Sequence, residues 1–240
     1  MADEIFEHPR LAAIYDALDP DRSDLDAYVA VADELRARDV LDVGCGTGTF
    51  ALVLADRGLE VTGVDPAGAS LAVARGKAGA ERVRWIHGDA TKLPPLVVDL
   101  ATMTGNVAQA FVEESDWDGT LGGIYEALRP GGHFVFETRD PAFEGWREWH
   151  DTSHTYTEIE GVGAVEHWGE LTDVSLPLVT FRWTFIFPDG EVVASDSTLR
   201  FRARDEVQST LVAHGYVVED VRGAPDRPGR EFVFFARRPR

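Results

Sequence analysis

The chain of 240 residues is long enough for one domain with a substantial core and an inserted subdomain. Its formal net charge of −19 disfavours nucleic-acid phosphates and anionic membranes as partners, and its single cysteine, Cys45, excludes an intrachain disulfide. No apolar run approaches the roughly 20 residues of a membrane helix. Residues 1–4 lack the basic and apolar regions of a signal peptide, so we expect a cytoplasmic protein.

Two helices are predicted before the first strand. Apolar residues recur at helical spacing within residues 8–19, and a second helical pattern spans residues 24–38. Strands and helices then alternate. The sequence predicts strands at 39–43, 60–64, 82–87, 97–102 and 133–138, and helices at 47–57, 67–77 and 117–128. This alternation is typical of a parallel sheet with helices on both faces.

The pattern changes after Asp140. Residues 141–152 look irregular, and residues 155–202 alternate as β-strands do. Three or so antiparallel strands are expected there, at 162–170, 179–187 and 192–201, with Pro188-Asp189-Gly190 as a hairpin turn. A helix at 205–214 and strands at 216–221 and 231–237 complete the predicted elements.

The most informative segment is the first strand with the loop that follows it. Three glycines, Gly44, Gly46 and Gly48, let the backbone approach a ligand closely, because glycine has no Cβ and tolerates positive φ. Asp42 lies just before them, and Asp65 ends the next apolar run. A carboxylate at the entrance is unfavourable for phosphates, but it suits an amino group and a ribose. The spacing D-x-G-x-G-x-G also differs from the dinucleotide fingerprint G-x-G-x-x-G.

These residues resemble the class I S-adenosylmethionine-dependent methyltransferases. Gly88-Asp89-Ala90 and residues 128–134 are further matches, in the family's order and spacing, over about residues 38–140. The arrangement looks most like methyltransferases of amino sugars and other natural-product intermediates. The resemblance implies a Rossmann-like doubly wound α/β fold whose seven-stranded sheet has an antiparallel last strand. It also implies a helical lid (1–38), a cofactor-binding domain (39–140 and 203–240) and an antiparallel β insertion that covers the substrate (141–202).

The resemblance also implies roles for the loop residues. The methionine part of S-adenosylmethionine would lie against Gly44 and Gly46, and Asp42 would approach its amino group. Asp65 would accept hydrogen bonds from both ribose hydroxyls. The alternative for Asp65 and Asp89 is that they only cap the helices or turns that follow. The full set expected to bind cofactor is Asp42, Gly44, Cys45, Gly46, Asp65, Pro66, Asp89, Ala90 and Thr104.

Catalytic residues stay unassigned, because methyl transfer from a sulfonium needs mainly proximity, orientation and a dry site. His150 is a candidate general base, and Asn106 and Tyr15 could face the substrate; the alternatives are an ordinary turn for Asn106 and a core-packing role for Tyr15. His150 and His154 lack a helical context and a cysteine partner, so no metal site is predicted.

Candidate substrate contacts are one pair of arginines and several tryptophans in the insertion and its approach. They could hold a cationic amine by cation–π contact or line an apolar pocket, or they could form the core of the insertion. These residues are Arg139, Trp146, Trp149, Trp168, Arg182 and Trp183.

The sequence therefore predicts a methyltransferase that moves a methyl group from S-adenosylmethionine to a small molecule by in-line displacement and releases S-adenosylhomocysteine. We expect a monomer or homodimer. A first alternative is an S-adenosylmethionine-binding protein with a non-methylating or regulatory role. A second is a nicotinamide-dependent oxidoreductase, against which the glycine spacing and the lack of a Tyr-x-x-x-Lys motif argue.

Overall fold

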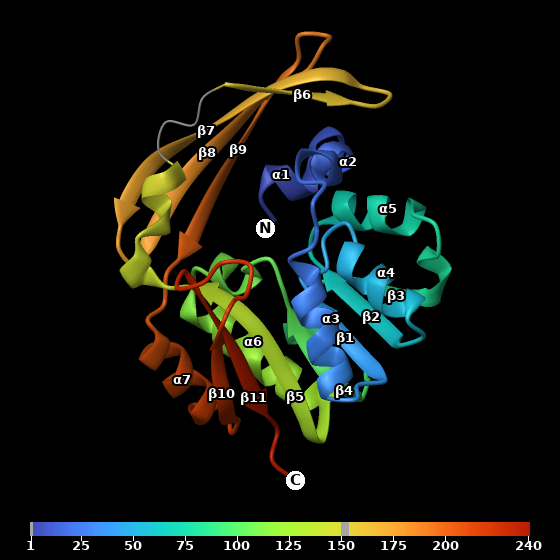
Figure 1. The fold of residues 1–240 in the computed structure, drawn as a ribbon, viewed down its shortest axis with the longest axis vertical. Coiled ribbons are helices and arrows are strands. Elements are labelled where there is room, and N and C mark those ends of the chain that lie inside the picture. The colour runs from blue at the N-terminus through green and yellow to red at the C-terminus, as the bar shows by residue number, and fades with distance from the viewer. Residues whose placement is uncertain (1, 150–153) are drawn as a thin grey trace.

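The computed structural model describes residues 2–149 and 154–240. Its centre is a seven-stranded sheet of order β10-β11-β5-β4-β1-β2-β3 (Figure 1). The strands are β1 (Asp39–Val43), β2 (Glu60–Asp65), β3 (Val83–His87), β4 (Val98–Met103), β5 (Leu128–Arg139), β10 (Val217–Gly223) and β11 (Glu231–Arg237). The last strand, β11, runs antiparallel to both of its neighbours, β5 and β10, while β1 to β5 pair in parallel. The predicted fold class is confirmed.

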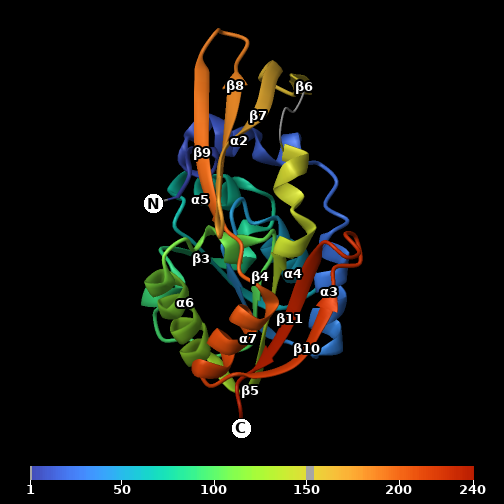
Figure 2. The ribbon, with the colours of Figure 1, turned by 90° about the vertical axis from the view of Figure 1, so that its left-hand side faces the viewer.

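Helices cover both faces of this sheet (Figure 2). They are α3 (Leu25–Glu34), α4 (Thr49–Asp56), α5 (Gly68–Gly76), α6 (Glu114–Ala127) and α7 (Arg204–Ala213). On one face, Tyr28 of α3 and Leu54 of α4 share a buried cluster with the sheet. On the other face, Leu121 of α6 and Leu211 of α7 do the same. Burial on both faces explains why β1 is an apolar run with four of its five residues buried.

The strand order reverses next to β1, which lies between β2 and β4. The chain leaves β1 for a helix on one face and β4 for a helix on the other. The loops therefore diverge, and a crevice opens at the carboxyl ends of these strands. Figure 1 shows two short helices above this edge, α1 (Glu4–Glu7) and α2 (Pro9–Leu18).

A second sheet arches over these helices (Figure 1). It has four antiparallel strands, β6 (Thr155–Ile159), β7 (Gly163–Ser175), β8 (Leu178–Ile186) and β9 (Val192–Arg200). The prediction of three or so strands missed β6, because only one of its five residues is buried and its sequence is mostly polar. It also ended β7 too early, since this strand continues through an irregularity between Leu171 and Asp173.

Other boundaries differ by a few residues. α6 begins at Glu114 rather than Trp117, with Glu114 and Asp116 in its first turn, where the helix dipole favours acidic side chains. α3 ends at Glu34, before Arg36 takes a positive φ of 52°. Short 3-10 helices, Pro141–Phe143 and Gly145–Trp149, occupy part of the stretch expected to be irregular. Within the described residues, no helix is long and apolar enough to span a membrane.

α6 packs very closely on the turn that follows β3. A Cβ built on Gly123 would lie 1.8 Å from the carbonyl oxygen of Ala90, so only glycine allows this approach. One position earlier, a Cβ on Gly122 would meet no atom within 4 Å. The two adjacent glycines thus sit in very different surroundings on the same helix.

We predict that Gly123→Ala lowers the free energy of unfolding by roughly 1–3 kcal/mol, because α6 or the turn at Ala90 must shift to admit the methyl group. Gly122→Ala is the matched control. It should be neutral or stabilising by up to about 1 kcal/mol, since alanine favours helix over glycine. Urea unfolding of both variants measures the difference, and equal stabilities would contradict the packing argument.

Candidate functional site

A cavity of about 760 Å³ opens at the carboxyl ends of β1, β2 and β4, at the point where the strand order reverses. Its walls include every residue that the sequence predicted to bind cofactor: Asp42, Gly44, Cys45, Gly46, Asp65, Pro66, Asp89, Ala90 and Thr104. Tyr15, named as a candidate for catalysis or substrate contact, also lines it. The sequence prediction and the structure therefore point to the same crevice.

The loop after β1 forms the floor of the cavity. Gly44 and Gly46 have positive φ values of 71° and 52°, which side chains with a Cβ rarely adopt. A Cβ on Gly44 would lie 2.6 Å from Val107, whereas one on Gly46 would meet nothing within 4 Å. Val107 thus packs against the loop at Gly44, whereas the loop faces open space at Gly46.

Asp42 is a nearly fully buried carboxylate under this loop, with 2% of its surface exposed. Its only described hydrogen bond comes from the Thr102 hydroxyl, 3.2 Å from Oδ1, on the neighbouring strand β4. Burial raises the pKa of Asp42 to about 7; the Thr102 bond opposes this rise and the nearby Asp65 carboxylate adds to it. A cationic ligand in the cavity would favour the ionised form.

Asp65 ties the end of β2 to the glycine loop. Its Oδ2 accepts a hydrogen bond from the Gly46 amide at 2.8 Å, and its Oδ1 accepts one from the Ala67 amide at 2.7 Å. Burial raises its pKa, and these two amide bonds oppose the rise. A carboxylate offers about four acceptor positions, so each oxygen can still accept a further hydrogen bond from a ligand. Asp65 therefore does cap the turn that follows β2, as the alternative interpretation predicted. This capping does not prevent it from also binding a ligand.

Asp89 and Ala90 form the wall at the end of β3. One Asp89 oxygen, Oδ1, accepts from the Thr91 amide at 2.8 Å and caps the 3-10 helix Ala90–Lys92. Ala90 is buried against α6, while Asp89 is exposed. The cap fixes this corner of the cavity and leaves Oδ2 of Asp89 without a hydrogen bond in the described residues.

The N-terminal helices close the cavity from above. Tyr15 packs against Phe6, with ring centroids 5.5 Å apart, and both side chains line the cavity. The neighbouring Asp16 accepts a hydrogen bond from the Thr47 hydroxyl at 2.6 Å and pairs with Lys77 at 2.6 Å. α2 is therefore fastened to the glycine loop through Asp16.

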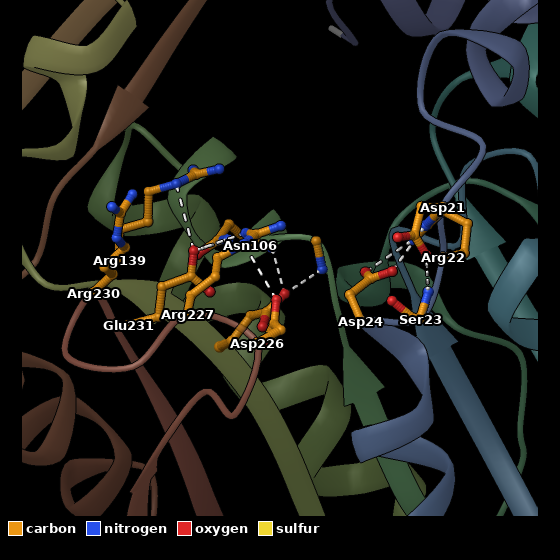
Figure 3. A network of polar contacts seen from close by, with 12 residues as sticks. Asp21, Arg22, Ser23, Asp24, Asn106, Arg139, Asp226, Arg227, Arg230 and Glu231 are labelled. Carbon is orange, nitrogen blue, oxygen red and sulfur yellow. Dashed lines mark hydrogen bonds and ion pairs between the residues drawn. The ribbon is translucent and has the colours of Figure 1, made fainter.

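A buried polar network lies beside the loop after β4 (Figure 3). The Asn106 side chain is 3% exposed and donates to Glu231 at 3.1 Å. It is not part of the cavity wall, so the structure brings it into this network rather than towards a substrate. Glu231 also accepts from Arg227 at 2.9 Å, and Arg139 lies 3.7 Å away.

The six predicted substrate residues do not line the main cavity. Arg139 and Trp149 border a second, smaller cavity of about 190 Å³, where the guanidinium carbon lies 5.1 Å from the tryptophan ring centre. Trp146 is 3% exposed and packs edge-on against Phe201, which makes it a core residue.

The other three belong to the second sheet. Trp168 stacks on His154 at 4.2 Å. Arg182 makes two hydrogen bonds to the exposed Asp196, at 2.7 and 2.8 Å. Trp183 lies 6.0 Å from the His167 ring. His150, the candidate base, lies outside the described residues.

Several residues of the site were not found from the sequence. Phe6, Arg22 and Phe111 line the cavity, and nothing in their local sequence distinguishes them. Glu137 lies outside the cavity wall but accepts a hydrogen bond from the Tyr28 hydroxyl, and an acid within the apolar run of β5 is an unusual residue for a buried strand. This acid in an apolar strand is the feature of the sequence from which a buried polar contact could have been predicted.

The cavity fits S-adenosylmethionine in its donors and acceptors. Two buried carboxylates, Asp42 and Asp65, suit an ammonium group and ribose hydroxyls, and the open face at Gly46 admits a chain lying on the backbone. The hydroxyl of Thr120 lines the cavity, is buried and has no hydrogen-bond partner in the described residues.

Comparisons with known proteins agree with this chemistry. Residues 40–132 match the methyltransferase domain family. Over 111 residues the chain is 40% identical to a demethylmenaquinone methyltransferase of Thermus thermophilus, in a match that covers 45% of this chain and 50% of that protein. The chain spans about half the length of the curated relatives it matches.

Two solved structures extend the comparison to nearly the whole chain. One is an S-adenosylmethionine-dependent methyltransferase from Clostridium acetobutylicum, with a TM-score of 0.76, 18% identity and coverage of 97% of this chain and 99% of that one. The other is an amino pentose methyltransferase from Micromonospora echinaspora with bound cofactor, with a TM-score of 0.71, 23% identity and coverage of 94% and 95%. Residues 40–132 are therefore similar to a methyltransferase domain, and the chain as a whole has the fold of these S-adenosylmethionine-dependent methyltransferases.

Proposed function

We propose that this chain is an S-adenosylmethionine-dependent methyltransferase whose acceptor is a small molecule. One observation carries the proposal. The glycine loop and the carboxylates Asp42, Asp65 and Asp89 converge on one cavity of about 760 Å³, inside the segment that matches a methyltransferase domain.

The cofactor would supply a methyl group already activated on a sulfonium, so the protein's work is to bind, orient and exclude water. Asp42 and the glycine loop would hold the amino-acid end, and Asp65 the ribose. Asp89, Ala90 and the buried Thr120 would surround the adenine. Phe6 and Tyr15 would shield the reacting atoms from water, because both line the cavity from the N-terminal helices.

The acceptor would enter between the cavity and the second sheet. Among the six residues predicted to contact substrate, Arg139 and Trp149 are the best supported. They share a separate cavity, and within the described residues the Arg139 guanidinium has only a 2.8 Å bond to the neutral Gln109 and a 3.7 Å contact with Glu231. Its other donors have no partner in that part of the chain and would be available to an acceptor. The named relatives act on a quinone precursor and an amino pentose, which supports a small organic acceptor here.

The alternative of a non-methylating cofactor-binding protein is tested in one experiment. The purified protein is incubated with S-adenosylmethionine carrying a labelled methyl group and with fractionated metabolite extracts. Cofactor-dependent label in a small-molecule product supports the proposal. Tight cofactor binding with no labelled product in any fraction favours the alternative. The cytoplasmic location, the monomeric or dimeric state and the absence of a nucleic-acid partner stay predictions from the sequence.

We predict that Asp65→Ala and Asp89→Ala each weaken the binding of S-adenosylhomocysteine by ~1–3 kcal/mol, as expected when buried ligand hydroxyl or amino groups lose their acceptors. Asp65→Ala should have the larger effect, because Asp65 also holds the Gly46 amide. Calorimetry measures both, with the exposed Asp56→Ala in α4 as control. Unchanged affinity in both variants would mean that the cofactor binds elsewhere.

A pH dependence follows from Asp42. Its folded pKa of about 7 lies above the roughly 3.9 of an unfolded aspartate, so the folded state loses stability as pH rises from about 4 to about 7 and loses no more above that. Asp42→Asn removes this titration. Relative to wild type, the ligand-free variant should gain about 2–3 kcal/mol of stability between about pH 5 and about pH 7.5.

Urea unfolding at the two pH values measures this gain. Asp99→Asn is a useful contrast. The Asp99 carboxyl is partly buried, which raises its pKa, but hydrogen bonds donated by the backbone and by Arg129 outweigh this and lower the pKa. Because both the folded and the unfolded pKa of Asp99 lie below this pH window, Asp99→Asn should lose the same stability at both pH values. A pH-independent difference for Asp42→Asn would contradict the raised pKa.

A further inference from the structure

Glu137, near the end of β5, is a buried acid that the proposed function does not use directly. It is 5% exposed and follows the fully buried Phe136. Its Oε1 accepts hydrogen bonds from the Gly105 amide at 2.6 Å and the Asn106 amide at 3.2 Å, and its Oε2 accepts one from the Tyr28 hydroxyl. A buried carboxylate costs free energy unless it is well hydrogen-bonded. Glu137 is well hydrogen-bonded in this sense, because it has three donors from two segments that are distant in the sequence.

The two amide donors belong to the loop that follows β4. Gly105 and Asn106 both have positive φ, 70° and 61°, so successive N–H groups turn towards the same carboxylate. Consecutive amides arranged in this way form a concavity that binds an anion. For Asn106 the left-handed conformation is unfavourable by itself, and surrounding contacts must hold it.

The Asn106 side chain supplies one of those contacts. It donates to Glu231, which is 3% exposed and which also accepts from Arg227 (Figure 3). Two buried carboxylates, one on β5 and one on β11, therefore hold this loop from below.

The direction of the loop carbonyls follows from the amides. In a trans peptide, the carbonyl of one residue points opposite to the N–H of the next. Since the Gly105 and Asn106 amides point at Glu137, the carbonyls of Thr104 and Gly105 point away from it. Thr104 and Gly105 both line the main cavity. These carbonyls are thus available to accept hydrogen bonds from a ligand's ammonium group.

We propose that Glu137, supported by Tyr28, is a positioning residue for the amino-acid half of the cofactor. It touches no ligand atom. It fixes the loop so that the carbonyls of Thr104 and Gly105 face the ammonium group, and Tyr28 links that loop to α3. The proposal rests on the proposed function, because it assumes that S-adenosylmethionine occupies the cavity.

The test compares two ligands that differ only at the amino-acid end. S-adenosylhomocysteine carries the ammonium and carboxylate groups, and 5′-methylthioadenosine lacks them while keeping the adenosine. Glu137→Gln preserves the side-chain shape but replaces one of the two acceptor oxygens by an NH2 group. It therefore cannot accept all three hydrogen bonds that the carboxylate accepts. We expect it to weaken S-adenosylhomocysteine about tenfold or more, and 5′-methylthioadenosine less than about twofold.

Two further variants sharpen the result. Tyr28→Phe leaves the carboxylate in place and removes one donor, so it should weaken S-adenosylhomocysteine in the same direction but less; it also carries the test if Glu137→Gln does not fold. Glu170→Gln, an exposed glutamate of β7, is the matched control and should change neither affinity.

The outcomes are distinct. A selective loss of S-adenosylhomocysteine affinity supports the positioning role. An equal loss for both ligands, or no loss in Glu137→Gln and Tyr28→Phe, overturns it while leaving the proposed function standing. If the wild-type protein binds neither nucleoside, the proposed function itself fails and this role fails with it.

Discussion

The structure depends on burying negative charge along one edge of its central sheet. Asp42, Asp65, Glu137 and Glu231 lie at this edge, and each is less than a tenth exposed. Such groups are tolerated only where hydrogen bonds replace the lost water. Asp65 and Glu137 each accept two backbone amides, and Glu231 accepts an amide side chain and a guanidinium. Asp42 has only the Thr102 hydroxyl.

This uneven distribution of donors gives the site its chemical character. Three of the carboxylates are used to hold the loops after β1 and β4 in conformations with positive φ. The fourth, Asp42, has the Thr102 hydroxyl as its only described donor, so burial raises its pKa with little to oppose the rise. A cationic ligand placed over the glycine loop would complete the arrangement. Because the protein's own carboxylates hold these loops, the loops are preorganised for a ligand, which favours affinity.

The convergence of the predicted cofactor residues on one cavity could be predicted from the sequence, because these residues are tied to local structure. Apolar runs fix the parallel strands, and the carboxyl ends of such strands meet at one edge. Asp42, Gly44 and Asp65 lie at those ends, so their convergence follows from chain order alone. β1 was predicted with the bounds that the structure has, because all its neighbours are strands and it is buried on both sides.

The acceptor side could not be predicted in the same way. An aromatic residue in a strand has the same local pattern whether it packs in a core, as Trp146 does, or borders a cavity, as Trp149 does. Side-chain contacts across the fold decide between them, and the sequence does not contain those contacts. Glu137 and Tyr28 are 109 positions apart, and their hydrogen bond depends on how α3 lies against the sheet.

α2 connects the two sides. Leu11 and Ile14 pack under the second sheet with Phe185, while Asp16 on the same helix binds Thr47 of the glycine loop. Movement of the second sheet away from the cavity would therefore pull on the helix that closes the cavity. α1 is held by the Ile5 amide, which donates to Ser195 at 2.9 Å, and by the Ser70 hydroxyl, which donates to the Phe6 carbonyl at 2.8 Å. Ile5 also packs against the cluster of Leu11, Ile14 and Phe185, so α1, α2 and the second sheet form one packed unit above the cavity.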